Sequence, residues 1–141
     1  MADSFTDAER YEQAAGNMTA TAVAAHEFMK QKGVDPAEFW AFFGETYAPG
    51  WADVRGDLTE IARYVALNMT SVGCTTETTR TDAAVTITAS WPDDIDDPEW
   101  PIPVRPALSA MNASFEPIMR YLGLTFSSED EPNGVAFRLA E

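Results

Sequence analysis

The sequence predicts one α+β domain, in which a four-stranded antiparallel sheet is flanked by about four helices in the order ααα-ββ-α-ββ. The first observation is that apolar residues recur at helical spacing over residues 6–70 and alternate after residue 71. The second is that helical spacing returns once, before two short alternating segments end the chain. The third is the length of 141 residues, because a chain of ~150 residues buries roughly 70% of its unfolded surface in one core. We therefore expect a single domain, 1–141, with a helical part over 6–70 and a mixed part over 71–140.

Capping signals place the first two helices. Thr6 and Glu9 form a capping box at the start of a helix that Gly33 closes. Within this helix Gly16 is a weak point, at which the helix can break in two. The second helix begins at Asp35, with a proline at its first position, and ends at a Pro-Gly pair.

A change of period separates the third helix from the first two strands. Asp57 caps a helix that runs to about Asn68, and its buried stripe consists of Leu58, Ile61, Val65 and Met69. Alternation follows, and one face of the first strand holds Val72, Cys74, Thr76 and Thr78. The second strand points Val85, Ile87 and Ala89 to one side, and a short connection at residues 80–82 makes the pair a hairpin.

Residues 91–104 read WPDDIDDPEWPIPV, and their prolines exclude a regular helix or an interior strand. We expect a long acidic loop here, bracketed by Trp91 and Trp100. Long loops without secondary structure are often functional or mobile.

One more helix and two strands complete the domain. The helix is expected over Pro106–Leu122, with a break near Ser114 because Pro117 interrupts its pattern. Strands are expected at residues 124–127 and 135–139. An acidic turn that ends in Asn-Gly joins them, and this dipeptide favours a hairpin.

The charge balance excludes several classes of protein. With 23 acidic and 9 basic residues the net charge is −14, which repels nucleic acid. No uncharged stretch reaches the ~18–20 residues of a membrane helix, so no membrane partner is expected. Cys74 is the single cysteine and the first residues carry acids rather than an apolar run, so we expect a cytoplasmic location. The acidity also fits a salt-adapted source, and the sequence leaves this open.

The chain ends in the order helix, strand, acidic turn, strand. The helix contains the stretch FEPIMRYLG (residues 115–123), and the last strand contains GVAFR (residues 134–138). Over roughly residues 55–140 this layout resembles the 4-vinyl reductase domain family, which is related in fold to ligand-binding domains of nitric-oxide signalling and of Golgi transport factors. The resemblance implies a dimeric domain that binds or senses a small molecule. That family carries cysteines around its final strands, whereas this chain has Asn133 and Ala136, so the resemblance implies no metal or thiol role here.

Aromatic residues crowd the second helix and the turn after it. They fit either core packing or the wall of an apolar ligand pocket. On the second interpretation the ligand-binding residues are Phe39, Phe43, Tyr47 and Trp51, with Trp91 and Trp100 closing the pocket. The expected ligand is an apolar or aromatic small molecule, neutral or cationic because the acidic surface disfavours anions.

Two other functions stay open from the sequence. The first is a protein-interaction module that uses exposed aromatics and the acidic proline-rich loop. The second is a small hydrolase or lyase that uses His26, the single histidine, with a carboxylate. No pattern of catalytic residues, metal ligands or cofactor-binding residues is present, so we expect no cofactor and no metal, and the sequence does not decide whether a reaction is catalysed.

Overall fold

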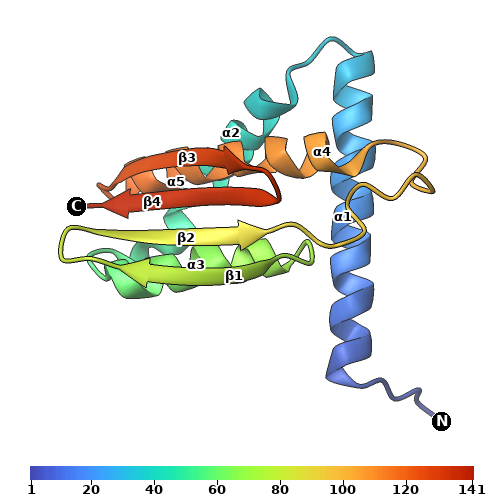
Figure 1. Cartoon of the computed structure of the whole chain (residues 1–141), viewed down its shortest axis with the longest axis horizontal. Helices are drawn as coiled ribbons and strands as arrows, with labels where there is room; N and C mark the ends of the chain where they lie inside the picture. The colour runs from blue at the N-terminus through green and yellow to red at the C-terminus, as the bar shows by residue number, and fades with distance from the viewer.

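The computed structural model describes residues 1–141, and its order of elements confirms the predicted α+β class (Figure 1). The elements are α1 (Asp7–Gln31), α2 (Pro36–Tyr47), the 3-10 helix η1 (Ala48–Val54), α3 (Leu58–Thr70), β1 (Thr75–Arg80), β2 (Ala84–Ser90), α4 (Val104–Met111), the 3-10 helix η2 (Asn112–Ser114), α5 (Phe115–Tyr121), β3 (Thr125–Glu131) and β4 (Gly134–Ala140). The predicted break near Ser114 is confirmed, because η2 separates α4 from α5. None of the helices combines the length and the apolar character that crossing a membrane requires.

The sheet has the strand order β1-β2-β4-β3, and every neighbouring pair is antiparallel. Its two central strands turn one face inward, and the buried residues on that face are Val85, Ile87, Ala89, Val135, Phe137 and Leu139. α3 packs on β1 and β2, and α5 packs on β3, so the helices cover one face of the sheet (Figure 1). The opposite face carries threonines and Arg138 and is open to solvent.

Phe137 lies at the centre of the core and is fully buried. Its ring packs edge-on against Phe115, with ring centroids 5.2 Å apart, and stacks on Phe126 at 5.9 Å. Every residue of the predicted stripe on α3 is buried, which confirms that stripe. The residues that pack between helix and sheet are therefore those with helical or alternating spacing in the sequence.

α1 is a single helix, so Gly16 does not break it in two. The predicted capping box is present, because the backbone N–H of Thr6 donates to Glu9 Oε2 (2.7 Å) and the N–H of Glu9 donates to Thr6 Oγ1 (3.1 Å). A single glycine destabilises a helix by only ~1 kcal/mol, and packing of α1 on α4 outweighs that loss. α1 stands beside the end of the sheet at which β2 and β3 finish (Figure 1).

Two strand boundaries differ from the prediction. β1 begins at Thr75, because Gly73 has a φ of 84° and turns the chain just before the strand. β3 extends through the acidic residues to Glu131, so the turn shrinks to Pro132 and Asn133. An edge strand accommodates carboxylates that point to solvent, and this explains why the acidic segment pairs with β4 rather than forming a turn.

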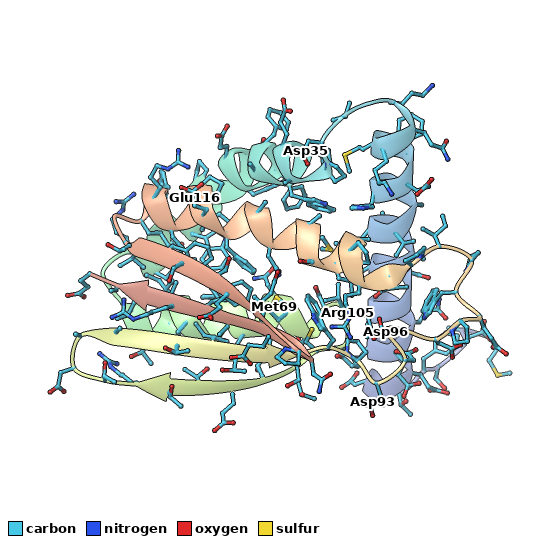
Figure 2. All side chains as sticks on the ribbon, turned by 45° about the horizontal axis from the view of Figure 1, so that its top comes forward. Asp35, Met69, Asp93, Asp96, Arg105 and Glu116 are labelled. Atoms are coloured by element: carbon cyan, nitrogen blue, oxygen red, sulfur yellow. The ribbon has the colours of Figure 1, made fainter.

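The acidic loop between β2 and α4 has no helix or strand, as predicted, but it is tied to the rest of the domain. Asp96 and Arg105 face each other beside α1 (Figure 2), and the guanidinium donates to both carboxylate oxygens of Asp96, at 3.1 and 2.6 Å. A further N–H of Arg105 donates to the carbonyl of Pro132 at 3.2 Å. This pair lowers the pKa of Asp96 and raises that of Arg105. The loop is thereby joined to the turn between β3 and β4.

Candidate functional site

The position of α2 determines the candidate site. Asp35 caps α2 beside α1 (Figure 2), where its Oδ1 accepts from the N–H of Ala37 at 3.0 Å. α2 packs on α4, η2 and α5, and these helices lie between α2 and the sheet in Figure 2. Gly44 allows this approach, because a Cβ at that position would overlap the carbonyl oxygen of Ser114 and lie 2.8 Å from Pro117 Cγ.

A cavity of about 360 Å³ lies between α2, η1, the end of α3 and the α4–α5 segment. We call it the α2 cavity, and its lining residues are Met18, Trp40, Phe43, Tyr47, Trp51, Asn68, Met69, Ser71, Val72, Leu108, Met111, Asn112, Ser114, Phe115 and Ile118. No charged side chain belongs to this lining, although the chain carries a net charge of −14. Each of four further cavities has at least one acidic side chain in its lining.

Aromatic rings form one side of the α2 cavity. Trp40 packs edge-on against Phe43 with ring centroids 5.4 Å apart, and Phe43 packs against Tyr47 at 4.7 Å. Trp51, on η1, is oriented by an edge-on contact with Tyr64 at 5.8 Å. Met69 and the buried residues of α4 and α5 form the bottom of the cavity.

Polar groups of the α2 cavity lie at its exposed rim. Asn68 Nδ2 donates to the carbonyl of Tyr64 at 2.8 Å, which leaves its Oδ1 as an acceptor. Ser71 Oγ donates to the carbonyl of Asn68 at 2.6 Å. The rim therefore offers hydrogen bonds without a charge.

Trp40 contributes a buried polar atom beside the cavity. Its side chain is only 5% exposed, and its Nε1 has no hydrogen-bond partner. A ligand acceptor would reach this N–H only after a neighbouring side chain moves, because the nitrogen itself is covered. We therefore assign Trp40 to the wall and do not treat its N–H as a recognition group.

The structure brings together three of the six predicted ligand-binding residues. Phe43, Tyr47 and Trp51 line the α2 cavity. Phe39 does not, because it lies on the outer side of α2, where its side chain is 40% exposed and packs edge-on against Trp40.

The two loop tryptophans do not close the α2 cavity. Trp91 is a core residue, 8% exposed, whose backbone N–H donates to the carbonyl of Asn133 at 2.8 Å. Trp100 donates from Nε1 to the carbonyl of Asp94 at 3.1 Å and lines a separate cavity between α1 and the loop. These contacts anchor the loop ends, which explains why both residues are absent from the α2 cavity.

Sequence reasoning missed most of the other lining residues. A signal for Trp40 was present, because the buried side of α2 carries small residues at helical spacing around it: Ala37, Ala41, Gly44 and Ala48. Small residues mark the side on which another element approaches closely. The rim residues Asn68 and Asn112 had no such signal, since the cavity joins parts of the chain that are distant in sequence.

Two reactive side chains lie elsewhere. Cys74 is buried, and loss of solvation raises the pKa of its thiol to about 11, so the thiol stays protonated at neutral pH. His26 does not line the α2 cavity, and its Nδ1 is buried without a partner. No three His, Cys, Asp or Glu side chains lie close enough together to hold a metal ion.

His26 provides a testable pH dependence. Burial, followed by the positive charge of Lys30, lowers its pKa below the ordinary 6.5. The folded protein then binds fewer protons than the unfolded chain, so stability is full above pH 6.5 and declines as the pH falls through the folded pKa. We expect a lower Tm at a pH of about 5.5 than at about 7.5, measured by circular dichroism. His26→Gln should flatten this difference, and an unchanged pH profile in that variant would show that other groups cause it.

Comparisons with known proteins identify no family for this chain. No protein-family model matches the chain, and a search of the curated proteins finds no match.

Proposed function

We propose that this domain binds a neutral apolar or aromatic small molecule in the α2 cavity. The observation that carries the proposal is the uncharged lining of this cavity in a chain with a net charge of −14. Its volume of about 360 Å³ falls in the roughly 300–1,000 Å³ range of small-molecule sites. An apolar lining with a few polar groups is typical of such sites.

The side chains that line the α2 cavity limit the kinds of ligand that fit it. Met18, Met69 and Met111 contribute flexible, polarisable thioethers that adapt to an aromatic ring. The aromatic residues offer edges and faces for ring contacts, and the rim amides suit a polar end on an otherwise apolar molecule. A cation finds no carboxylate in this lining, and an anion is repelled at the surface, so a neutral ligand fits best.

The proposal includes a homodimer and a binding or sensing role. Both are what the resemblance to the 4-vinyl reductase domain family implies, and both stay predictions. A catalysed reaction is not part of the proposal, because the α2 cavity has no histidine, cysteine, lysine or carboxylate in its lining that could activate the hydroxyls of Tyr47, Ser71 and Ser114.

A fluorescent probe tests the cavity directly. We expect N-phenyl-1-naphthylamine, which is neutral and aromatic, to bind with enhanced fluorescence. Tyr47→Ala and Trp51→Ala should each weaken its affinity about tenfold, because an aromatic contact contributes roughly 0.5–1.5 kcal/mol beyond burial. Leu67→Ala is the matched control, since Leu67 is 54% exposed and does not line the cavity. Equal affinities in all four proteins would place the probe elsewhere.

Native mass spectrometry of the purified protein, beside a denaturing run, asks whether a ligand is already present. A mass excess that disappears on denaturation would give the mass of a retained molecule. Loss of that excess in Trp51→Ala, but not in Leu67→Ala, would assign the molecule to the α2 cavity. An excess retained in Trp51→Ala would contradict the assignment.

A protein-interaction surface is the second candidate function, and one observation favours it: Phe42 on α2 is 64% exposed. The loop is less suited to this role than the sequence implied. Trp91 is buried, and the loop is held by Arg105, so its apolar side chains are largely used within the domain.

A further inference from the structure

A second cavity, of about 250 Å³, lies between α1 and the acidic loop. We call it the loop cavity. Tyr11, Glu12 and Gly16 line it from α1, and Asp94 and Trp100 line it from the loop, which runs beside α1 in both views (Figure 1, Figure 2). Two of these residues are acidic, and no basic residue belongs to the lining. Its chemistry therefore differs from that of the uncharged α2 cavity.

The two acidic residues of the loop cavity lack a cation as a partner. The three ion pairs of the structure use Glu60, Asp96 and Glu116, so neither Glu12 nor Asp94 takes part in one. They belong to two different segments, and a positive charge placed between these segments is attracted by both carboxylates. The net charge of −14 adds to this attraction at long range.

Two aromatic rings of the loop cavity are held by hydrogen bonds from their polar ends. Tyr11 Oη donates to the carbonyl of Thr70 at 2.7 Å, and Trp100 Nε1 donates to the carbonyl of Asp94 at 3.1 Å. Tyr11 is still 47% exposed, so its hydrogen bond fixes a ring that packing does not cover. Aromatic faces attract cations, tryptophan most strongly, and rings that are already fixed lose little freedom when a ligand binds.

We propose that the loop cavity binds a small organic cation of the methylated-ammonium class. The positive charge suits the two carboxylates and the two rings. Methyl groups suit the apolar part of the lining, where Ile95, Val104 and Leu108 are buried. A primary ammonium fits less well, because it is strongly hydrated and needs acceptors for three N–H donors.

Size and charge limit this cation further. The volume of about 250 Å³ is below the roughly 300–1,000 Å³ of drug-sized sites, so the ligand is small. A phosphate next to the cation, as in a lipid headgroup, would be repelled by the carboxylates of Glu12 and Asp94. A free cation therefore fits better than a headgroup.

The loop cavity is distinct from the α2 cavity, although Val72 and Leu108 line both. The inference does not rest on the ligand proposed for the α2 cavity. Glu12, Asp94 and Trp100 do not line the α2 cavity, so substitutions of these residues test the loop cavity alone.

An NMR titration of the ¹⁵N-labelled full chain with choline tests the site. The chain has four tryptophans, and the indole N–H signal that is missing from Trp100→Leu identifies Trp100. In the wild type this signal should shift with choline until the shift saturates. 3,3-Dimethyl-1-butanol, which has the shape of choline without its charge, should bind about fivefold more weakly or worse. No saturable shift with choline, or equal affinities for choline and the neutral alcohol, would overturn the proposal.

Phosphocholine separates the two sources of a methylated ammonium. It carries a phosphate next to the same cation, so it should bind more weakly than choline. An affinity equal to or above that of choline would overturn the choice of a free cation and would favour a lipid headgroup.

The exposed carboxylates allow each charge to be removed without disturbing the core. Glu12→Gln and Asp94→Asn should each weaken choline binding about threefold, the effect expected of an exposed pair of charges. Asp93→Asn is the matched control, because Asp93 is the neighbouring exposed residue and does not line the cavity (Figure 2). Wild-type affinity in both lining variants, or an equal loss in Asp93→Asn, would overturn the proposal.

A filling variant tests the position of the cation. A Cβ at Gly16 meets nothing within 4 Å, so Gly16→Leu adds a side chain at the lining of the cavity and also raises helix propensity. It should lose most of its choline affinity while the protein stays folded. Trp51→Ala, in the α2 cavity, should keep that affinity. Normal choline binding by Gly16→Leu, or its loss in Trp51→Ala, would contradict a separate cation site at the loop cavity.

Discussion

Gly134→Ala is expected to lower the free energy of unfolding by about 3 kcal/mol or more, the upper end of the range for overpacking. Gly134 is the first residue of β4, where it pairs with Ser90 on one side and Glu131 on the other. A Cβ at this position would overlap the carbonyl oxygen of Ala89 and lie 3.0 Å from its carbonyl carbon and 3.2 Å from Ser90 Cα. All of these atoms belong to the backbone of a central strand, so no side-chain rotation relieves the overlap.

Urea unfolding followed by circular dichroism measures this effect, with Gly16→Ala as the matched control. Gly16 is the same residue type inside α1, and a Cβ there meets nothing within 4 Å. Alanine at this position should stabilise the protein by up to ~1 kcal/mol through helix propensity. If Gly134→Ala unfolds at the same urea concentration as the wild type, β2 and β4 do not pair in the register described.

These two glycines show that the sequence predicts local structure but not the steric role of each glycine in the folded protein. The sequence identified Asn133-Gly134 as a hairpin signal, and the turn is there. The steric demand on Gly134 comes from Ala89, which lies in another hairpin far along the chain. Low helix propensity made Gly16 a point at which the helix can break, and packing on α4 keeps α1 continuous. Local signals therefore predict the elements, while contacts between distant segments decide how each glycine is used.

In the candidate site, too, some residues follow from local sequence patterns and others depend on contacts between distant segments. Helical spacing placed Phe43 and Tyr47 on a common face of α2, and both line the α2 cavity. The spacing alone did not decide which face of α2 is buried, because a stripe of small residues around Trp40 and a stripe of aromatic residues are both apolar. The loop residues Trp91 and Trp100 had no period to place them, and hydrogen bonds within the domain hold them away from the cavity.

Gly44→Ala is the second substitution with a large expected effect. Alanine has the higher helix propensity, but its Cβ would overlap a neighbouring segment. On propensity alone, alanine in the middle of α2 should stabilise the protein by ~1 kcal/mol. Gly44 faces η2, however, and its Cβ would overlap the carbonyl oxygen of Ser114 and lie 2.9 Å from the Ser114 carbonyl carbon. We expect a net destabilisation of about 1–3 kcal/mol in urea unfolding, because α2 and η2 must move apart or the helix must bend.

This substitution also acts on the α2 cavity. Trp40 and Phe43 on α2 line the cavity together with Ser114 and Phe115 of the neighbouring segment, so a displacement of α2 changes the shape of the cavity. We expect Gly44→Ala to lose most of its affinity for N-phenyl-1-naphthylamine while the protein is still folded. Thr46→Ala, at an exposed position of the same helix, raises helix propensity without adding an overlap and should keep the wild-type affinity. If Gly44→Ala instead gains stability and binds the probe normally, α2 does not lie against η2, and the cavity between them has a different shape.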